Sequence, residues 1–241
     1  MARYFLEVSY KGTAYSGFQT QENAHTIQAE VEKAFQVLQR ELVTLTGSSR
    51  TDAGVHARQN FFHFDFEQPL HEQFLYKMNA ILPGDIVIEN VHNVKSDAHC
   101  RFDAKYRRYR YYTYNEKNPF LEDRAWYFPY RLNKDLLQEA ASLVLAYQDF
   151  TSFSKRNTQV KTFICQVTDS RWIEEDGSLL YQVQSNRFLR GMVRALVSTM
   201  LLVGREKLTL HQFKEIIESR DCTKASFAAP AHGLFLEEVG F

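Results

Sequence analysis

The residues best suited to chemistry occupy a loop of mostly small side chains, residues 47–57, which reads GSSRTDAGVHA. Arg50 and Asp52 are two positions apart in this loop, and loops set on a rigid sheet often carry catalytic side chains. An ionised carboxylate such as that of Asp52 is able to act as a nucleophile or a base. A plain turn is the alternative, because Asp and Gly favour turns and an adjacent Arg is then merely solvated. His56 and His63 have no third ligand at a zinc-like spacing, so no metal is expected.

Residues 101–114 combine positive charge with aromatic rings. Only Asp103 opposes the basic residues of this segment, which are Arg101, Lys105, Arg107, Arg108 and Arg110. Alternation along a strand places Arg107, Tyr109 and Tyr111 on one face and Arg108, Arg110, Tyr112 and Tyr114 on the other. Cations for phosphates beside flat rings for bases are typical of an RNA-binding surface. The alternative is a sheet in which tyrosines pack normally and arginine side chains cover them.

Two further segments carry cations. In residues 186–194 the apolar positions predict the buried stripe of a helix, and Arg190 and Arg194 lie one turn apart beside that stripe. Taken alone this is a core helix with basic edges, and Arg194 matters for chemistry only where it points into the same cleft as Asp52. Residues 150–156 contain hydroxyl groups and Lys155, which suit a phosphate contact, although a connecting loop is the simpler interpretation.

The composition is that of an ordinary globular protein. The chain has 241 residues, of which 44% are hydrophobic, and its 29 basic and 29 acidic side chains give a formal net charge of zero. A general basic coating for nucleic acid is thereby excluded, whereas local patches are not. Three widely spaced cysteines exclude a disulfide scaffold and a zinc finger, and no apolar run is long enough to span a bilayer. We therefore expect a soluble cytoplasmic protein with reduced thiols.

Hydrophobic periodicity predicts the elements that position these residues. In the first part of the chain we expect helices at 27–38 and 74–82, and strands at 3–10, 42–46, 61–66 and 86–94. In the second part we expect helices at 133–146, 189–203 and 209–219, and strands at 107–114, 162–172, 179–185 and 234–239. Thr26 is the expected N-cap of the first helix, and Thr209 with Gln212 fits a capping box.

Each half of the chain thus has the order β-α-β-β-α-β, the ferredoxin-like arrangement. We predict an α+β fold with an N-terminal half at residues 1–104, which carries the Asp52 loop, and a C-terminal half at residues 105–241. Edge-to-edge pairing of the halves removes exposed strand edges and makes one continuous, mostly antiparallel sheet. The helices are then expected on one side of that sheet and the active-site cleft on the other.

Several of these segments occur in an order that closely resembles the tRNA pseudouridine synthase A family. They are RTDAGVHA at 50–57, RF at 101–102, RYRY at 108–111, FTSF at 150–153, MVR at 192–194 and APAHGL at 229–234. The resemblance covers essentially the whole chain, and the octapeptide is its most specific part. The doubled ferredoxin-like pattern is similar to the fold of that family.

The resemblance implies an isomerase that converts uridines 38, 39 and 40 of the tRNA anticodon stem-loop to pseudouridine, acting as a homodimer without cofactor or metal. It implies that Asp52 is the catalytic aspartate, that Arg194 pairs with it, and that Arg50 helps to extrude the target base. Such a pairing suits a closed pocket, where a carboxylate stays ionised when a guanidinium faces it. The remaining substrate-binding residues are expected to be Tyr109, which stacks on the uracil, and Arg107, Arg108, Arg110 and Lys155.

The chain departs from the family pattern at Ser49, Phe18 and Thr20, where Gly, Trp and Arg are common. Because position 20 lacks a cation, one alternative is a paralogue with a different RNA target or a different preference among the uridines. A non-catalytic RNA-binding module is another, since ferredoxin-like sheets often bind RNA through aromatic residues. A small-molecule hydrolase fits less well, because no nucleophile–His–acid set or metal motif is present.

Overall fold

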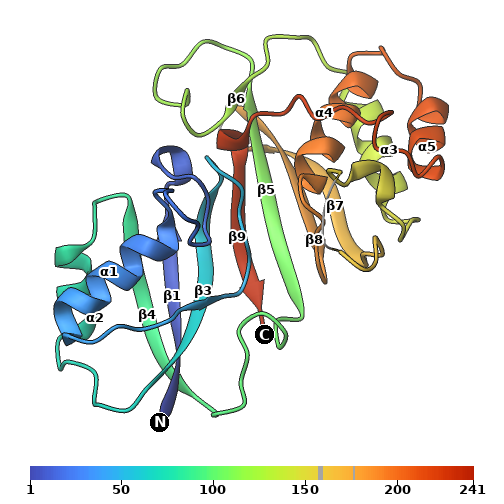
Figure 1. The fold of residues 1–241 in the computed structure, drawn as a ribbon. Helices are drawn as coiled ribbons and strands as arrows, with labels where there is room; N and C mark the ends of the chain where they lie inside the picture. The colour runs from blue at the N-terminus through green and yellow to red at the C-terminus, as the bar shows by residue number, and fades with distance from the viewer. Residues whose placement is uncertain (157–159, 176) are drawn as a thin grey trace. The chain divides into compact units, whose positions relative to one another are not determined.

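The computed structural model describes residues 1–156, 160–175 and 177–241. The chain forms two compact units (Figure 1). Unit 1 comprises Met1–Lys105 together with Leu236–Phe241, and unit 2 comprises Tyr106–Phe235. The end of the chain therefore belongs to the same unit as its beginning, which local sequence patterns do not reveal.

Unit 1 is an antiparallel sheet with two helices. Its elements are β1 (Ala2–Tyr10), α1 (Ile27–Gln39), β2 (Thr46–Gly47), β3 (His56–Phe66), α2 (Phe74–Ile81) and β4 (Ile86–Val94). The strands are ordered β4-β1-β3, with β2 paired to β3, and the final strand β9 (Leu234–Gly240) lies on the other side of β3. In the register between β1 and β3, Leu6 faces Phe62 and Tyr4 faces Phe64.

The core of unit 1 lies between this sheet and α1 and α2, which run along the same face of it (Figure 1). Alternation along β3 directs Phe62, Phe64 and Phe66 to this face. The ring of Phe35 on α1 packs edge-on against Phe64 and Phe66, at centroid distances of 5.2 and 5.1 Å. The side chain of Thr26 accepts a hydrogen bond from the amide of Ala29, so the expected N-cap of α1 is confirmed.

Unit 2 has a similar order of strands and helices with an additional short strand and an additional helix, whereas most of β9 belongs to unit 1. Its elements are β5 (Tyr106–Tyr114), β6 (Trp126–Tyr127), α3 (Lys134–Val144), β7 (Val167–Glu175), β8 (Ser178–Ser185), α4 (Met192–Gly204) and α5 (Leu210–Glu218). The antiparallel strands are ordered β5-β8-β7, and the short β6 runs parallel to the end of β5.

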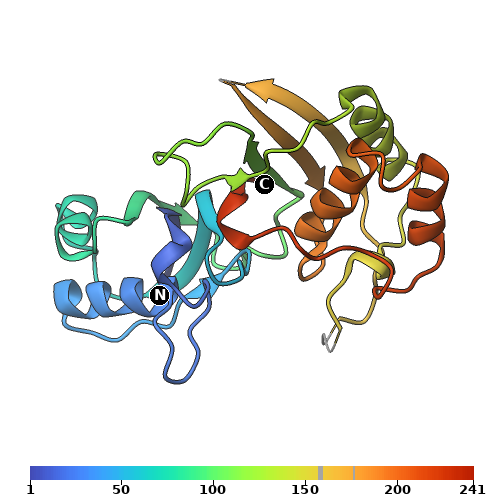
Figure 2. The same ribbon diagram turned by 90° about the horizontal axis from the view of Figure 1, so that it is seen from above.

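Helices α3, α4 and α5 gather on one side of β7 and β8 (Figure 2). The buried hydroxyl of Ser170 on β7 bonds to the carbonyl of Ala141 on α3 at 2.7 Å and to the Tyr181 hydroxyl on β8 at 2.8 Å. These bonds join the helix layer to the sheet. The capping box of Thr209 and Gln212 at the start of α5 is formed as predicted.

The prediction of an α+β fold is confirmed, while several strand bounds were wrong. The second strand was expected at residues 42–46 but is limited to Thr46–Gly47. The backbone of Leu45, immediately before this strand, bonds to side chains of α1 and not to a neighbouring strand. The amide of Leu45 donates to the Glu32 carboxylate, and the carbonyl of Leu45 accepts from the side chain of Gln28 at 2.8 Å. Strand β3 begins at His56 rather than at residue 61, β7 begins at Val167 rather than at residue 162, and β6 was not predicted. In the described ranges, no helix is long and apolar enough to cross a membrane.

Candidate active site

The loop of residues 48–55 joins β2 to β3 in unit 1 and carries Asp52 at a tight turn. The amide of Val55 donates to the carbonyl of Asp52 at 3.2 Å, and Gly54 between them has a positive φ of 78°. The amide of Phe18 donates to the carbonyl of Thr51 at 3.1 Å. The half-buried Asp52 is therefore carried by a turn whose backbone is held from the side by another segment.

A buried polar network fixes the backbone on both sides of Arg50. Asn60 on β3 is fully buried, and its Nδ2 donates to the carbonyl of Ser49 at 2.8 Å and to the hydroxyl of Tyr10 at 3.2 Å. The Tyr10 hydroxyl also lies 2.8 Å from the hydroxyl of Thr51. Because buried polar groups are costly when left unpaired, this network favours a single conformation of the loop.

The other end of the loop is held by Gly12 and His56. The amide of Gly12 donates to Nδ1 of His56 at 3.0 Å, so Nδ1 is an acceptor and His56 is part of the loop anchor. A Cβ atom at position 12 would lie 2.0 Å from the carbonyl oxygen of Val55, so only glycine fits there. Among the described residues, no three His, Cys, Asp or Glu side chains are grouped to hold a metal ion.

Tyr109 and Arg107 lie in unit 2 on the face of β5 that the helices cover. Tyr109 pairs with Val183 across the sheet and is 8% exposed. Its ring meets the ring of Phe188 edge-on at 5.0 Å. The guanidinium of Arg107 donates to the carbonyl of Asn186 at 3.2 Å. Tyr109 thus presents only a small part of its ring to the surroundings.

Arg108 and Arg110 lie on the opposite face of β5, as strand alternation requires. Arg108 donates through Nε and Nη2 to the side-chain oxygen of Gln184, at 3.2 and 2.8 Å. Arg110 donates to that of Gln182 at 2.9 Å, and Gln182 in turn donates to Asp169 at 2.7 Å. These two predicted RNA contacts are therefore members of a cross-strand network and do not share a face with Tyr109.

Arg194 and Lys155 each donate a hydrogen bond near the N-terminal end of α4. The amide of Lys155 donates to the carbonyl of Arg190 at 2.9 Å. Arg194, in the first turn of α4, donates through Nε to the carbonyl of Ala229 at 2.7 Å, which orients its guanidinium. The hydroxyl of Tyr111 donates to the carbonyl of the next residue, Pro230, at 2.8 Å. Burial raises the pKa of Tyr111, so this phenol remains a donor throughout the neutral range.

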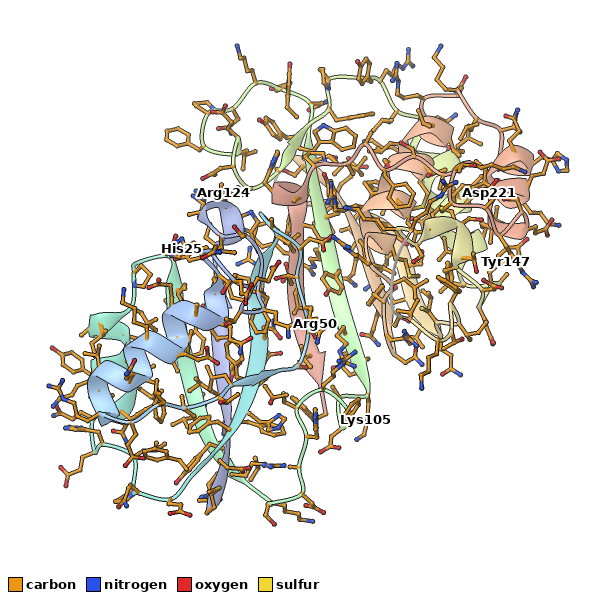
Figure 3. All side chains as sticks on the ribbon, in the orientation of Figure 1. His25, Arg50, Lys105, Arg124, Tyr147 and Asp221 are labelled. Carbon is orange, nitrogen blue, oxygen red and sulfur yellow. The ribbon has the colours of Figure 1, made fainter. Side chains whose placement is uncertain are left out.

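The predicted residues are divided between the two units. Arg50 and Asp52 share one anchored loop in unit 1, and Arg50 is exposed (Figure 3). Tyr109, Arg107, Arg194 and Lys155 belong to unit 2. Sequence reasoning missed the residues that anchor the loop, Tyr10, Gly12 and Asn60. The available signal was a polar amide immediately before the phenylalanine run of β3.

The structure gives local contacts for Phe18, Ser49 and Thr20, the three residues expected to depart from the family pattern. The ring of Phe18 is buried and stacks on Phe62 at 4.5 Å with an interplanar angle of 11°. Ser49 is buried, and its carbonyl is the acceptor for Asn60. Thr20 is exposed, and its hydroxyl lies 3.4 Å from a carboxylate oxygen of Glu32.

Comparison with known proteins identifies the family. The family model described as tRNA pseudouridine synthase matches residues 7–103 and 140–241. The chain is 45% identical to tRNA pseudouridine synthase A of Porphyromonas gingivalis, over 99% of this chain and 97% of that protein. It is 41% identical to the protein of the same name from Parabacteroides distasonis, over 100% and 96%, and 40% identical to that from Clostridium acetobutylicum, over 97% of each. The chain therefore belongs to the tRNA pseudouridine synthase family.

Proposed function

We propose that this protein converts uridines 38, 39 and 40 of the tRNA anticodon stem-loop to pseudouridine, with Asp52 as the catalytic carboxylate. Its family makes it an isomerase that acts on uridines of tRNA. The observation that carries the residue assignment is the anchored loop. A buried hydrogen-bond network holds this loop, which carries a half-buried carboxylate two residues from an exposed arginine.

The reaction itself explains why one carboxylate suffices. The glycosidic bond between N1 of uracil and C1′ of ribose breaks, the base turns, and a bond between C5 and C1′ forms. The proton on C5 is lost and N1 gains one, so that the product is an isomer of the substrate. Asp52 assists by attacking the sugar or the base, or by removing a sugar proton, and each route requires an ionised carboxylate near the target.

Arg194 is proposed to pair with Asp52 in the assembled site. The hydrogen bond to the carbonyl of Ala229 uses the Nε donor of Arg194, and the guanidinium carries further donors on its two terminal nitrogens. A guanidinium suits this task because its fork matches both oxygens of a carboxylate and it does not lose its proton. Arg50 is proposed to occupy the space that the extruded base leaves, and Tyr109 to stack on the uracil.

The cations of unit 2 are proposed to contact the RNA backbone. Arg107, Arg108, Arg110 and Lys155 would offset phosphate charge, which is the main source of affinity in most nucleic-acid complexes. Arg108 and Arg110 also donate to glutamines of β8, and Nη1 of Arg110 lies 3.6 Å from a carboxylate oxygen of Glu175, so a phosphate would compete with these partners. We also propose that the protein is a cytoplasmic homodimer. Gel filtration at micromolar concentration would measure the number of subunits.

The decisive experiment is Asp52→Asn, assayed on unmodified tRNA with pseudouridine mapped at single-nucleotide resolution. The amide keeps the size of the side chain but cannot act as nucleophile or base. We expect turnover to fall by about a thousandfold or more, with tRNA affinity kept within about twofold. Asp135→Asn, at an exposed position of α3, is the matched control and should retain full activity.

Three results would overturn parts of the proposal. Turnover of Asp52→Asn at the wild-type rate would remove Asp52 from the chemistry. Conversion by the wild type of uridines outside the anticodon stem-loop would show a paralogue with a different target. Specific binding without conversion of any uridine would show an RNA-binding module.

A further inference from the structure

We propose that a pocket of unit 1 beside Arg50 binds one nucleotide of the tRNA that flanks the target uridine. In this subsite the base would stack on Phe102, and Arg101 would contact the phosphate. The pocket has a volume of about 180 Å³, and its lining includes Phe18, Gln19, Arg50, His99, Arg101 and Phe102. This inference rests on the proposed function, because it names a second contact of the same substrate.

The size of the pocket suits one planar ring. A protein cavity of about 150 Å³ is large enough for a benzene molecule, so a volume of about 180 Å³ accommodates a single nucleobase. The inner wall is formed by Phe18, whose ring is fixed by its stacking on Phe62. A pocket of this size with a rigid apolar wall is well suited to a flat, partly apolar ligand.

Phe102 supplies the exposed ring. Its side chain is 75% exposed, which is unusual for a phenylalanine. The ring is nevertheless held in place, since the His99 ring lies 4.2 Å from it and the amide of Phe102 donates to the carbonyl of His99 at 3.1 Å. A fixed ring that presents a large apolar surface to solvent is the feature on which single-stranded RNA bases stack.

The charges at the pocket favour a phosphate-bearing ligand. Arg50 and Arg101 both line it, and none of the lining residues among those the structure describes is acidic. The carboxylate of Glu32 lies behind the wall, where it accepts from the side chain of Gln28 and the amide of Leu45. The guanidinium of Arg101 lies 5.7 Å from the centre of the Phe102 ring, so one ligand can reach the cation and the ring together. The exposed amide of Gln19 offers both a donor and an acceptor to the edge of a base.

The position of the pocket indicates which nucleotide it takes. Arg50 lines the pocket, and its Cα atom lies at most about 7 Å from the Cα atom of Asp52, which is two residues further along the chain. That distance is on the scale of the spacing between neighbouring nucleotides in one strand. The ligand is therefore expected to be a nucleotide immediately before or after the target.

The test combines variants of the pocket with RNA that lacks a single base. Phe102→Ala and Arg101→Ala should each raise the Kd and KM for the anticodon stem-loop about tenfold, with kcat unchanged, whereas Arg101→Lys should recover most of the affinity. Stem-loops with an abasic nucleotide on the 5′ or the 3′ side of the target should bind the wild type about tenfold more weakly at one of these two positions. With the stem-loop that is abasic at that one position, Phe102→Ala and the wild type should have the same Kd, because the base that would stack on Phe102 is already missing.

Tyr76→Ala and Lys33→Ala are matched controls, since both side chains are exposed in unit 1 and do not line the pocket. They should bind RNA like the wild type. The inference is overturned if Phe102→Ala keeps Kd within twofold, or if the effects of Phe102→Ala and of the abasic nucleotide add at both positions. Binding is measured separately from conversion, so failure of the subsite and failure of the proposed function give different results.

Discussion

Asn60 shows how a single buried side chain controls the proposed catalytic loop. Its amide is fully buried in a strand of phenylalanines and donates to the backbone of Ser49 and to Tyr10, which bonds to Thr51. Asn60 itself lies away from Asp52 in sequence and acts through the loop backbone. It is therefore a positioning residue in the proposed mechanism, and its hydrogen bonds set where Arg50 and Asp52 can lie.

We predict that Asn60→Ala lowers kcat more than it changes KM. The variant leaves the carbonyl of Ser49 without this donor, which costs about 1–3 kcal/mol of stability, and a displacement of the carboxylate by about 1 Å lowers turnover about a hundredfold. Steady-state kinetics at a temperature where the protein is fully folded measures this effect. Ile217→Ala in α5, also buried, is the control that loses stability without losing kcat. Equal kcat in wild type and Asn60→Ala would contradict the positioning role.

At the scale of elements, the loop of residues 48–55 depends on the segment that follows β1. That segment contributes Gly12 against Val55 and His56, and Phe18 against Thr51. The two segments are separated by α1 in the chain and meet only because β1 and β3 pair in the sheet. The register of these strands therefore determines the conformation of the loop.

We predict that Gly12→Ala destabilises unit 1 and lowers activity, whereas Gly84→Ala does neither. The added Cβ would lie 2.0 Å from the carbonyl oxygen of Val55, and relief of that clash requires backbone movement in the loop. Overpacking of this kind costs about 1–3 kcal/mol. At Gly84 a Cβ has no neighbour within 4 Å. Thermal unfolding and turnover of the two variants should separate them, and similar values for both would show that the close approach at Gly12 is unimportant.

For the molecule as a whole, the formal net charge is zero, and we expect the buried residue His63 to make its stability depend on pH. His63 is 7% exposed, and its Nδ1 lies 3.2 Å from the sulfur of Cys100. Burial lowers the pKa of His63 to about 4, from 6.5. Between these values the unfolded chain binds a proton at this position that the folded chain does not. His63 is therefore neutral in both states above pH 6.5 and costs no stability there. As the pH falls from 6.5 toward 4, protonation of His63 in the unfolded chain lowers the free energy of unfolding.

We predict that acidification from pH 7.5 to pH 5 removes about 2 kcal/mol of stability through His63. Urea unfolding at the two pH values measures the difference. His63→Gln lacks the titrating group and should lose less stability between the same pH values, even if it is less stable at both. An unchanged pH dependence in this variant would assign the effect to other groups.

The amino-acid pattern alone predicts the order of most elements, the helix caps at Thr26 and Thr209, and the loop that contains Arg50 and Asp52. These features depend on residues close together in the chain, so periodicity and turn chemistry reveal them. Three further features are visible only in the folded chain. Side chains of α1 replace a strand partner at Leu45, glutamines of β8 bond to Arg108 and Arg110, and Asn60 and Gly12 anchor the loop. Each of these contacts joins residues that are distant in sequence, and each depends on strand register and helix placement, which no local pattern specifies.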